Sequence, residues 1–556
     1  MVIFQCPFVG ADTKTSVAIH ESMGKRWEMH GNKIALIDCE TERRLSYNQL
    51  LKMAQSVAWT LLDQYHVTSN DVIMICLENR SEFAALLVGI TATGAAMSGI
   101  NPILTVNEMA YHLEESETSY IITRSELLDK ITSAISRLSS NRIKKIFLYD
   151  NPLNSPNMCA PLKSLFDRSS NGFPTSRVGD PRRHVGFVAF SSGTTGKPKP
   201  VLLPHQNVTS YWISSDLSGA ATRPDDRLLE ILPFFHLAGL GLTLMQQLWS
   251  GSTGFVMPKY EPTRLLQFIE KHKITYLQAN PSVVGFLAKD SRVHHYDLSS
   301  LKTVGYGTAP LGLEVIRQLK KQLPAINYLI QFYGMTETGM IASSPRTSNL
   351  DDESLRSVGL LVQNTRAKIV SLDDTNTELG PNQSGQVCVM TDGPMLGYKN
   401  RPEATAEMIL PNKWMLTGDI GYFDDRGQLY ISDRIKELIK YKGWQIAPAE
   451  LEDTIMKHPA VVEVAVAGIR KTGQDDDVGE LATAFVVIEK DYKPTALLAM
   501  EIAKVVEQNH APYKHLRGGV RFVPEIRKGA SGKKLRRILR DRFNKESSKS
   551  TQKSKL

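Results

Sequence analysis

The stretch Ser191 to Pro200, which reads Ser-Ser-Gly-Thr-Thr-Gly-Lys-Pro-Lys-Pro, decides how the rest of this sequence is interpreted. Apolar runs precede it (Val185 to Phe190) and follow it (Val201 to Leu203), so the pattern predicts a strand, a loop and a returning strand. Two glycines let the backbone bend, while hydroxyls and lysines supply donors and positive charge for an ordered polyphosphate. The stretch therefore predicts a nucleotide-phosphate loop, although a surface turn has a similar composition. Lys197 is followed by Pro198 rather than Ser or Thr, which argues against a P-loop NTPase.

The composition indicates a globular protein with more than one domain. A single core rarely extends over 556 residues, and 42% hydrophobic with 22% charged residues is ordinary for a globular chain. Five scattered cysteines without Cys-x-x-Cys spacing predict neither a disulfide framework nor a zinc site. The uncharged runs 83–105 and 231–258 are interrupted by Gly, Pro and polar residues. We therefore expect core segments there and no transmembrane segment.

The positive charge is concentrated at the C-terminal end. Residues 511–556 hold 15 Lys and Arg against 3 Asp and Glu. A basic lid over a phosphorylated small molecule fits this charge, and no nucleic-acid recognition motif accompanies it, so no nucleic-acid partner is expected. The last residues, Ser554-Lys555-Leu556, match the peroxisomal address and follow a polar tail. They predict a peroxisomal matrix protein that binds the import receptor through this tripeptide.

Alternating short apolar strands and amphipathic helices run from about residue 33 to 343, which predicts an α/β fold with mostly parallel sheets. Short strands and turns from residue 367 to 431 predict a small β-barrel-like unit. The pattern then changes to a smaller α+β segment that ends in a basic helix. We expect a large domain over residues 1–433, a small mobile C-terminal lid over 434–543, and a polar tail over 544–556.

A second polar loop, Gln331 to Gly339, reads Gln-Phe-Tyr-Gly-Met-Thr-Glu-Thr-Gly. Together with Ser191 to Lys199 it resembles the acyl-adenylate-forming enzymes, which include acyl-CoA synthetases, 4-coumarate-CoA ligases, beetle luciferases and peptide-synthetase adenylation domains. The resemblance extends in order through nearly the whole chain: Pro233 to His236, Gly307 to Pro310, Gly397-Tyr398, Pro402 to Thr405, Trp414 to Asp419, Ser432 to Glu452 and Gly529 to Arg537.

The resemblance implies a reaction in which a carboxylate attacks the α-phosphate of ATP, pyrophosphate leaves, and a thiol attacks the acyl-AMP. The cosubstrates would be ATP and coenzyme A, with Mg²⁺ held by Glu337. Catalytic roles would fall to Lys533, Thr336, Glu337 and His236. The nucleotide contacts implied are Ser191, Ser192, Gly193, Thr194, Thr195, Lys199, Thr308, Gln331, Phe332, Tyr333, Asp419, Arg434, Lys436, Lys440 and Gln445.

The same resemblance implies rotation of the small domain between the two steps, with Lys436 at the hinge. Lys442 and Gly443 would line the entry for the CoA thiol. The acyl pocket would be lined by Leu237, Ala238, Gly239, Tyr306, Gly307, Met335 and Met340.

Four residues depart from the letters usual in the family: Pro200, Tyr306, Phe332 and Arg527. Small residues and the lack of an evident second cation favour an apolar acyl chain, so we expect an ATP-dependent acyl-CoA synthetase acting on a fatty acid. Tyr306 and Phe332 leave a 4-coumarate-like aromatic acid open. The motifs are also compatible with a luciferase-like monooxygenase and with a catalytically silent nucleotide- or acyl-binding protein.

Overall fold

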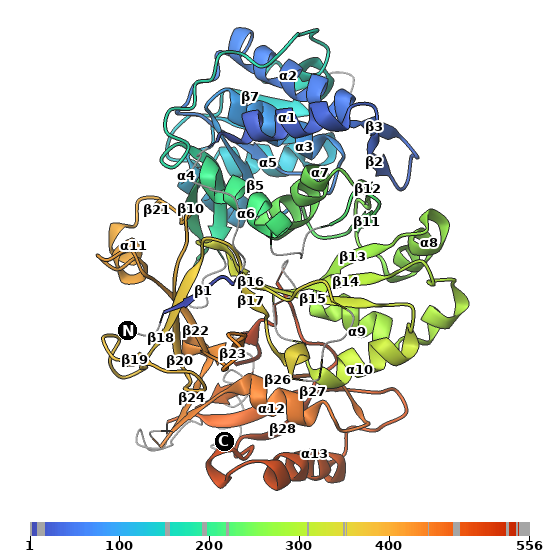
Figure 1. Cartoon of the computed structure of the whole chain (residues 1–556), viewed down its shortest axis with the longest axis vertical. Coiled ribbons are helices and arrows are strands. Elements are labelled where there is room, and N and C mark those ends of the chain that lie inside the picture. Colours follow the sequence, from blue (N-terminus) through green and yellow to red (C-terminus); the bar gives the residue numbers. More distant parts are fainter. Residues whose placement is uncertain are drawn as a thin grey trace, which may run out of the picture.

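The computed structural model describes residues 3–7, 17–150, 156–191, 197–217, 222–308, 311–347, 351, 353–442, 444–470, 479–529, 533–536, 538–540 and 543. Their elements form three large sheets and a separate C-terminal domain (Figure 1).

The first sheet has eight strands in the order β21-β10-β9-β5-β4-β6-β7-β8. Strands β4 to β9 run parallel, whereas β10 is antiparallel to both β9 and β21. The strands are β4 (Val72–Ile75), β5 (Ala96–Gly99), β6 (Tyr120–Thr123), β7 (Lys145–Leu148), β8 (Cys159–Pro161), β9 (Val185–Ser191), β10 (Lys199–Pro204) and β21 (Gly397–Tyr398). The accompanying helices are α1 (Ile19–His30), α2 (Tyr47–Asp63), α3 (Glu82–Ala92), α4 (Val106–Ser116), α5 (Leu128–Ile135), α6 (His205–Leu217) and α11 (Pro402–Met408).

The second sheet has nine strands in the order β17-β16-β15-β14-β13-β11-β12-β2-β3. Its strands are β2 (Ile34–Asp38), β3 (Arg44–Ser46), β11 (Arg227–Glu230), β12 (Thr253–Val256), β13 (Tyr276–Ala279), β14 (Thr303–Tyr306), β15 (Tyr328–Met335), β16 (Gly339–Ser343) and β17 (Leu360–Leu361). A π-helix, η3 (Ala238–Met245), leads into α7 (Gln246–Ser250), and α8 (Pro262–His272), α9 (Pro281–Lys289) and α10 (Leu313–Gln322) follow.

Two hydrophobic cores lie on opposite faces of this second sheet. The first core contains Ile330 and Phe332 of β15 and extends into the eight-stranded sheet. The second core contains Leu329 of β15 and Tyr306 of β14 and packs against α8, α9 and α10. Because side chains alternate between the faces of a strand, neighbouring residues at the ends of β14 and β15 serve different cores.

The third sheet comprises β1 (Phe4–Gln5), β18 (Arg366–Val370), β19 (Glu378–Leu379), β20 (Gly385–Met390), β22 (Met415–Phe423) and β23 (Leu429–Arg434). The C-terminal domain follows with the hairpin β24 (Ile439–Tyr441) and β25 (Trp444–Ile446), then α12 (Pro448–Ile455) and α13 (Ala496–Asn509). Its three-stranded sheet consists of β26 (Val461–Ile469), β27 (Leu481–Ile488) and β28 (Gly519–Phe522). Figure 1 shows this domain, in orange and red, at the far end of the molecule from α1 to α3.

The predicted α/β class is confirmed, and so are the two strands predicted on either side of the phosphate loop, since Lys199 pairs with Ser191 across β9 and β10; residues 192–196 lie outside the described residues. Pro200 stands opposite Phe190 within this ladder. The connection 150–179, rich in Asn, Pro and Ser, holds β8 and a short 3₁₀ turn at Leu162–Leu165. The exact domain limits at 433 and 543 stay predictions.

The apolar residues of the basic C-terminal helix are only partly buried. Leu539 joins a small core, with Phe543 packed against it. Leu535 and Ile538 are each 37% exposed. This segment therefore packs on the domain through Leu539 and Phe543.

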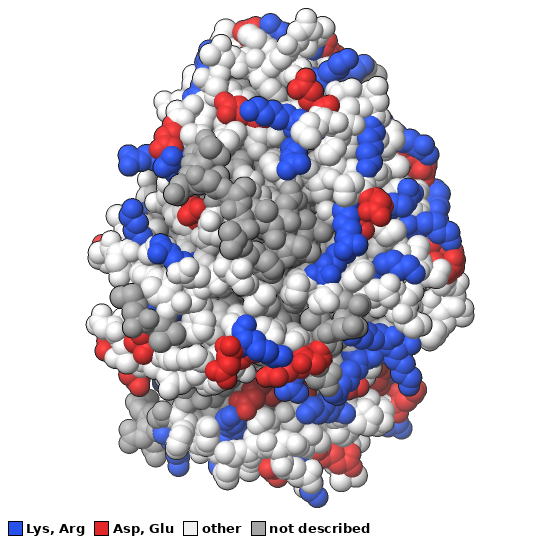
Figure 2. Space-filling model, viewed as in Figure 1, with Lys and Arg blue, Asp and Glu red and all other residues white. Residues whose placement is uncertain are grey.

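Cations of the C-terminal segment are paired with acidic residues of the same domain. Lys528 bonds Glu463 at 2.8 Å, and both Lys534 and Arg536 bond the buried carboxylate of Glu452. Figure 2 shows the same interleaving of Lys and Arg with Asp and Glu over the lower part of the visible face. These three cations are therefore paired within the domain, and in the described part of this segment they do not add to an unbroken basic surface. Among the described residues, no helix is both long and apolar enough to cross a membrane.

Candidate active site

A buried carboxylate, Asp419 on β22, is the centre of the site. Tyr333 of β15 donates its hydroxyl to Oδ2 of Asp419 at 2.7 Å, and Nε of Arg434 donates to Oδ1 at 3.0 Å. Arg434 is brought there by the pairing of β22 with β23, in which it stands opposite Asp419. Burial, reinforced by the charge of Asp419, holds the pKa of Tyr333 well above 10, so the phenol stays a donor. The three predicted residues therefore form one cluster, and Asp419 presents a negative charge that can accept bonds from ribose hydroxyls.

Lys533 of the C-terminal domain lies beside this cluster. Burial, together with the positive charge of Arg434, lowers the pKa of Lys533 to about 8, while Asp419 and Glu337 oppose the shift. These electrostatic couplings place the ammonium among residues of three different strands and loops of the large domain. The site therefore consists of residues from both domains, and Lys533 brings a positive charge to the acidic residues.

Glu337 lies in the turn between β15 and β16, where Thr336 is half-buried beside it. The hydroxyl of Tyr398 donates to Oε1 of Glu337 at 2.7 Å. Nζ of Lys199 lies 4.8 Å from the centre of the Tyr398 ring. Because Tyr398 pairs with Val201 through β21 and β10, the described end of the phosphate loop and the Glu337 turn are adjacent. Tyr398 belongs to one of the sequence motifs, but the sequence alone gave it no role.

His236 is a neutral imidazole in this site. Burial, together with the charge of Lys533, lowers its pKa to about 4. Nδ1 accepts the backbone N–H of Ala238 at 3.1 Å, so the neutral ring carries its proton on Nε2. His236 therefore offers an N–H donor near Lys533. The π-helix η3 begins two residues later, and a Cβ on Gly239 would lie 2.1 Å from the carbonyl oxygen of Pro233, so glycine is required for this close approach.

Thr308 has φ +70°, a left-handed conformation that a β-branched residue rarely adopts. Such strain is typical of functional positions. Just before it, a Cβ on Gly307 would lie 2.9 Å from the carbonyl oxygen of Phe332, so β14 and β15 approach closely here. This strained turn ends β14 next to the Tyr333 loop, as the resemblance implied for the adenine side.

The structure corrects the prediction that Tyr306 lines the acyl pocket. Tyr306 is buried in the second core, and its hydroxyl donates to Oε1 of Gln331 at 3.3 Å. Phe332 instead faces the first core, with its ring edge over the backbone of Gly305. Since Tyr306 and Gln331 pair in register, both point away from the face that carries Phe332.

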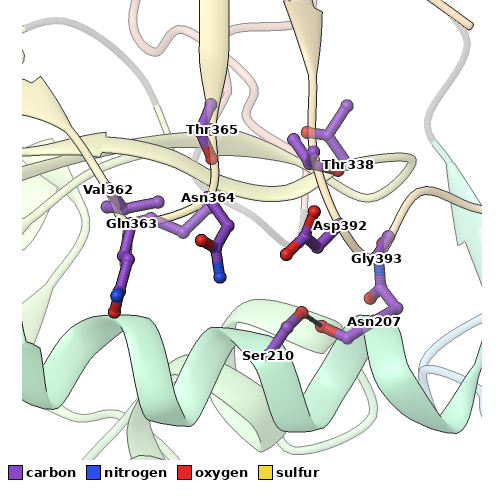
Figure 3. A pocket seen from close by; sticks show the side chains of 11 residues that line it. Asn207, Ser210, Thr338, Val362, Gln363, Asn364, Thr365, Asp392 and Gly393 are labelled. Carbon is purple, nitrogen blue, oxygen red and sulfur yellow. Dashed lines mark hydrogen bonds between the residues drawn. The ribbon is translucent and has the colours of Figure 1, made fainter. Parts of the chain in front are cut away.

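Met340, another predicted pocket residue, lines a polar pocket of about 20 Å³ behind the Glu337 turn (Figure 3). Asn207 and Ser210 of α6 form one wall, and Thr338 and Asp392 lie opposite, as Figure 3 shows. This volume suits a single ordered water. The pocket therefore supports the Glu337 turn from behind and has no room for an acyl chain. Leu237 and Met335 are half-buried against the first core, and Ala238 is also half-buried.

The residues predicted around the hinge lie apart from the Asp419 cluster. Lys440 and Gln445 pair with each other across the hairpin β24–β25, Lys442 is at its tip, and all three side chains are exposed. Lys436 is exposed in the preceding turn, and among the described residues it forms no ion pair with the cluster. Nucleotide and CoA contacts by these residues stay predictions. Ser192, Gly193, Thr194, Thr195, Gly443 and the tripeptide Ser554 to Leu556 lie outside the described residues.

Comparison with known proteins agrees with this geometry. The family described as AMP-binding enzyme matches residues 24–399, and the AMP-binding enzyme C-terminal domain matches residues 450–533. The chain belongs to this family of acyl-adenylate-forming enzymes, and it is an acid-thiol ligase.

Two curated relatives are similar along almost their whole length. A probable 4-coumarate-CoA ligase 1 of Dictyostelium discoideum is 34% identical, covering 92% of this chain and 93% of the relative. The 4-coumarate-CoA ligase 3 of Arabidopsis thaliana is also 34% identical, over 97% and 93%. Among solved structures, the anthranilate CoA ligase AuaEII in complex with anthranoyl-AMP superposes with a TM-score of 0.84 at 23% identity, covering 96% of this chain and 98% of that chain. This last likeness supports the fold alone.

Proposed function

We propose that the chain is an ATP-dependent CoA ligase for a compact aromatic acid of the 4-coumarate type. The main support is the 34% identity to proteins named 4-coumarate-CoA ligases. The similarity extends over more than nine-tenths of this chain and of each relative. The ring of Phe332 supports it, because an aromatic wall over Gly305 suits a planar acid. The fatty acid expected from the sequence is the second candidate, favoured by the small residues Ala238 and Gly239.

The residues of the site can perform the adenylation step. Lys533 would bridge the carboxylate of the acid and the α-phosphate oxygens, which lowers the repulsion between two anions as they meet. Asp419 would hold the ribose hydroxyls through its two bonded oxygens. Nε2–H of His236 would orient the carboxylate, and Thr336 would hold the α-phosphate.

Glu337 is a suitable ligand for Mg²⁺, because this ion is commonly bound by one or two carboxylates together with substrate phosphates. One oxygen of Glu337 is oriented by Tyr398. Bound there, the ion would neutralise charge on the departing pyrophosphate.

A panel of acids tests the substrate class. We expect carboxylate-dependent exchange of labelled pyrophosphate into ATP with 4-coumarate and CoA-dependent AMP release with the same acid. Exchange with octanoate and hexadecanoate but not with 4-coumarate would refute the aromatic proposal in favour of the fatty acid.

Peroxisomal residence stays a separate prediction. Comparison of a fluorescent fusion that retains Ser554 to Leu556 with one that lacks them tests it, and identical cytosolic patterns would contradict it.

A further inference from the structure

Buried polar side chains lie side by side on neighbouring strands of the nine-stranded sheet. They are level with Ile330 of β15, two residues before Phe332. Leu228 and Leu229 of β11 pair with Tyr276 and Leu277 of β13, so the next residue, Glu230, stands beside Gln278. Gln278 in turn pairs with Gly305 of β14. Glu230 is 1% exposed and Gln278 is 8% exposed. These three positions share one face of the sheet, which is the face of the first core that also carries Phe332.

The hydrogen bonding of Glu230 is incomplete. Its carboxyl bonds the hydroxyl of Thr243 in the π-helix η3, and that hydroxyl donates its single hydrogen to the carbonyl of Gly239 at 2.5 Å. Burial raises the pKa of Glu230 to about 8, so at neutral pH the acid is protonated and its O–H donates a hydrogen bond to the hydroxyl oxygen of Thr243. Oε1 is then left as a buried acceptor that has no partner among the described residues. A buried acceptor without a partner is destabilising, because it has lost its bond to water and gained none in the protein.

Gly305 leaves the neighbouring position without a side chain. A Cβ there would lie 2.9 Å from the ring of Phe332, 3.0 Å from the hydroxyl of Tyr276 and 3.6 Å from Cγ of Gln278. Glycine therefore lets an aromatic ring and two polar side chains approach the backbone together. The surface below Phe332 is consequently polar, which does not suit the end of an alkyl chain.

The two ends of the acyl site can be assigned from these contacts. His236 and Lys533, which are electrostatically coupled, mark the carboxylate end. Glu230 lies below η3, because Thr243, the sixth residue of that helix, bonds its carboxyl. We propose that Glu230 and Gln278 form the hydrogen-bonding end of the acyl site and select acids that carry a hydroxyl group at the end far from the carboxylate.

This inference rests on the proposed ligase function. A hydroxyl donating to Oε1 of Glu230 supplies the missing partner, whereas an acid without that hydroxyl leaves Oε1 unpaired. Sites that bind a substrate hydroxyl through buried polar groups discriminate strongly against the analogue that lacks it. We therefore expect at least a tenfold difference in kcat/KM between such a pair of acids.

The test uses two matched pairs of acids with the full-length chain: 4-coumarate against cinnamate, and 8-hydroxyoctanoate against octanoate. Pyrophosphate exchange is measured without CoA, so only adenylation is followed. A preference for the hydroxylated member in either reactive pair supports the inference. Equal kcat/KM within the reactive pairs overturns it, even if 4-coumarate is a good substrate. A preference seen only in the aliphatic pair supports the inference while refuting the aromatic substrate class, and failure of all four acids overturns both.

Variants then assign the preference to these residues. Glu230→Met and Gln278→Met keep the side-chain length but remove the hydrogen bonds, so each should reduce the preference at least fivefold, measured as the ratio of the two kcat/KM values within one variant. Leu229→Met is the matched control, because Leu229 is the preceding residue of β11 and faces the second core. A preference that survives both polar-to-Met changes would overturn the assignment, as would an equal loss in the control.

Discussion

Raising the pH from 7 to 9 should lower the rate of adenylation about tenfold, because Lys533 loses its proton. Its pKa in the free protein is about 8, because burial and Arg434 both disfavour the ammonium. Only the protonated form can bridge two anions, so activity is present below this pKa and is lost as pH rises through it. The protonated fraction falls about tenfold between pH 7 and pH 9. Tyr333 and Tyr398, the nearby phenols, have pKa values raised above 10 and do not titrate in this window.

The assay is kcat/KM for ATP in pyrophosphate exchange at a saturating acid concentration. This parameter reports ionisations of the enzyme form that meets ATP, and omitting CoA removes the titration of its thiol. Lys533→Arg should lower activity but abolish the alkaline limb of the pH profile, which is the fall in kcat/KM between pH 7 and pH 9, because guanidinium stays charged. Lys534→Arg is the matched control, since Lys534 bonds Glu452 instead, and it should retain the limb. A profile that is flat to pH 9, or a limb that persists in Lys533→Arg, would refute the reasoning.

Three further predictions concern the supports of the site and the fold. Tyr398→Phe should weaken adenylation about tenfold and raise the Mg²⁺ concentration for half-maximal exchange, because Glu337 loses a bond to a charged oxygen worth roughly 1.5–3 kcal/mol; an unchanged Mg²⁺ titration would contradict this. Asp226→Ala should lower the free energy of unfolding, measured in urea, by about 3–5 kcal/mol, because it leaves the buried guanidinium of Arg346 without its carboxylate partner. A loss below about 1 kcal/mol would contradict the prediction that this buried pair matters for stability. Burial lowers the pKa of His205 to about 3, so below about pH 6.5 this histidine binds a proton in the unfolded chain but not in the folded one. The free energy of unfolding should therefore fall between about pH 6.5 and pH 4, and it should fall less in His205→Gln. An equal fall in the variant would exclude His205 as the cause.

Local patterns predicted the elements well because strands and helices leave a periodic signature. Each of three predicted strands contains a short apolar run of the sequence: Ile34–Asp38, Tyr120–Thr123 and Thr303–Tyr306. The chemistry of the site was also predictable where one motif supplies a whole function, as Asp419 does with its two bonded oxygens.

Contacts that depend on register across strands were not predictable. The sequence placed Tyr306 on the wrong face, because a motif does not reveal which of two adjacent residues at a strand end points to which core. The bond between Tyr398 and Glu337 joins residues 61 apart and requires the pairing of β10 with β21. Glu230 carried no signal at all, since a carboxylate in an apolar run becomes informative only when its neighbour Gln278 and its unpaired oxygen are seen.

The most direct test of the account is to separate the two half-reactions in Lys533→Ala. Because Lys533 lies with Asp419 and Glu337 in this structure, we predict that acid-dependent pyrophosphate exchange falls at least 100-fold. Thioester formation from supplied 4-coumaroyl-AMP and CoA should stay within about threefold of the unmodified protein. An exchange rate that is retained, or a thioester rate that falls as far as the exchange rate, would contradict the assignment of Lys533 to adenylation.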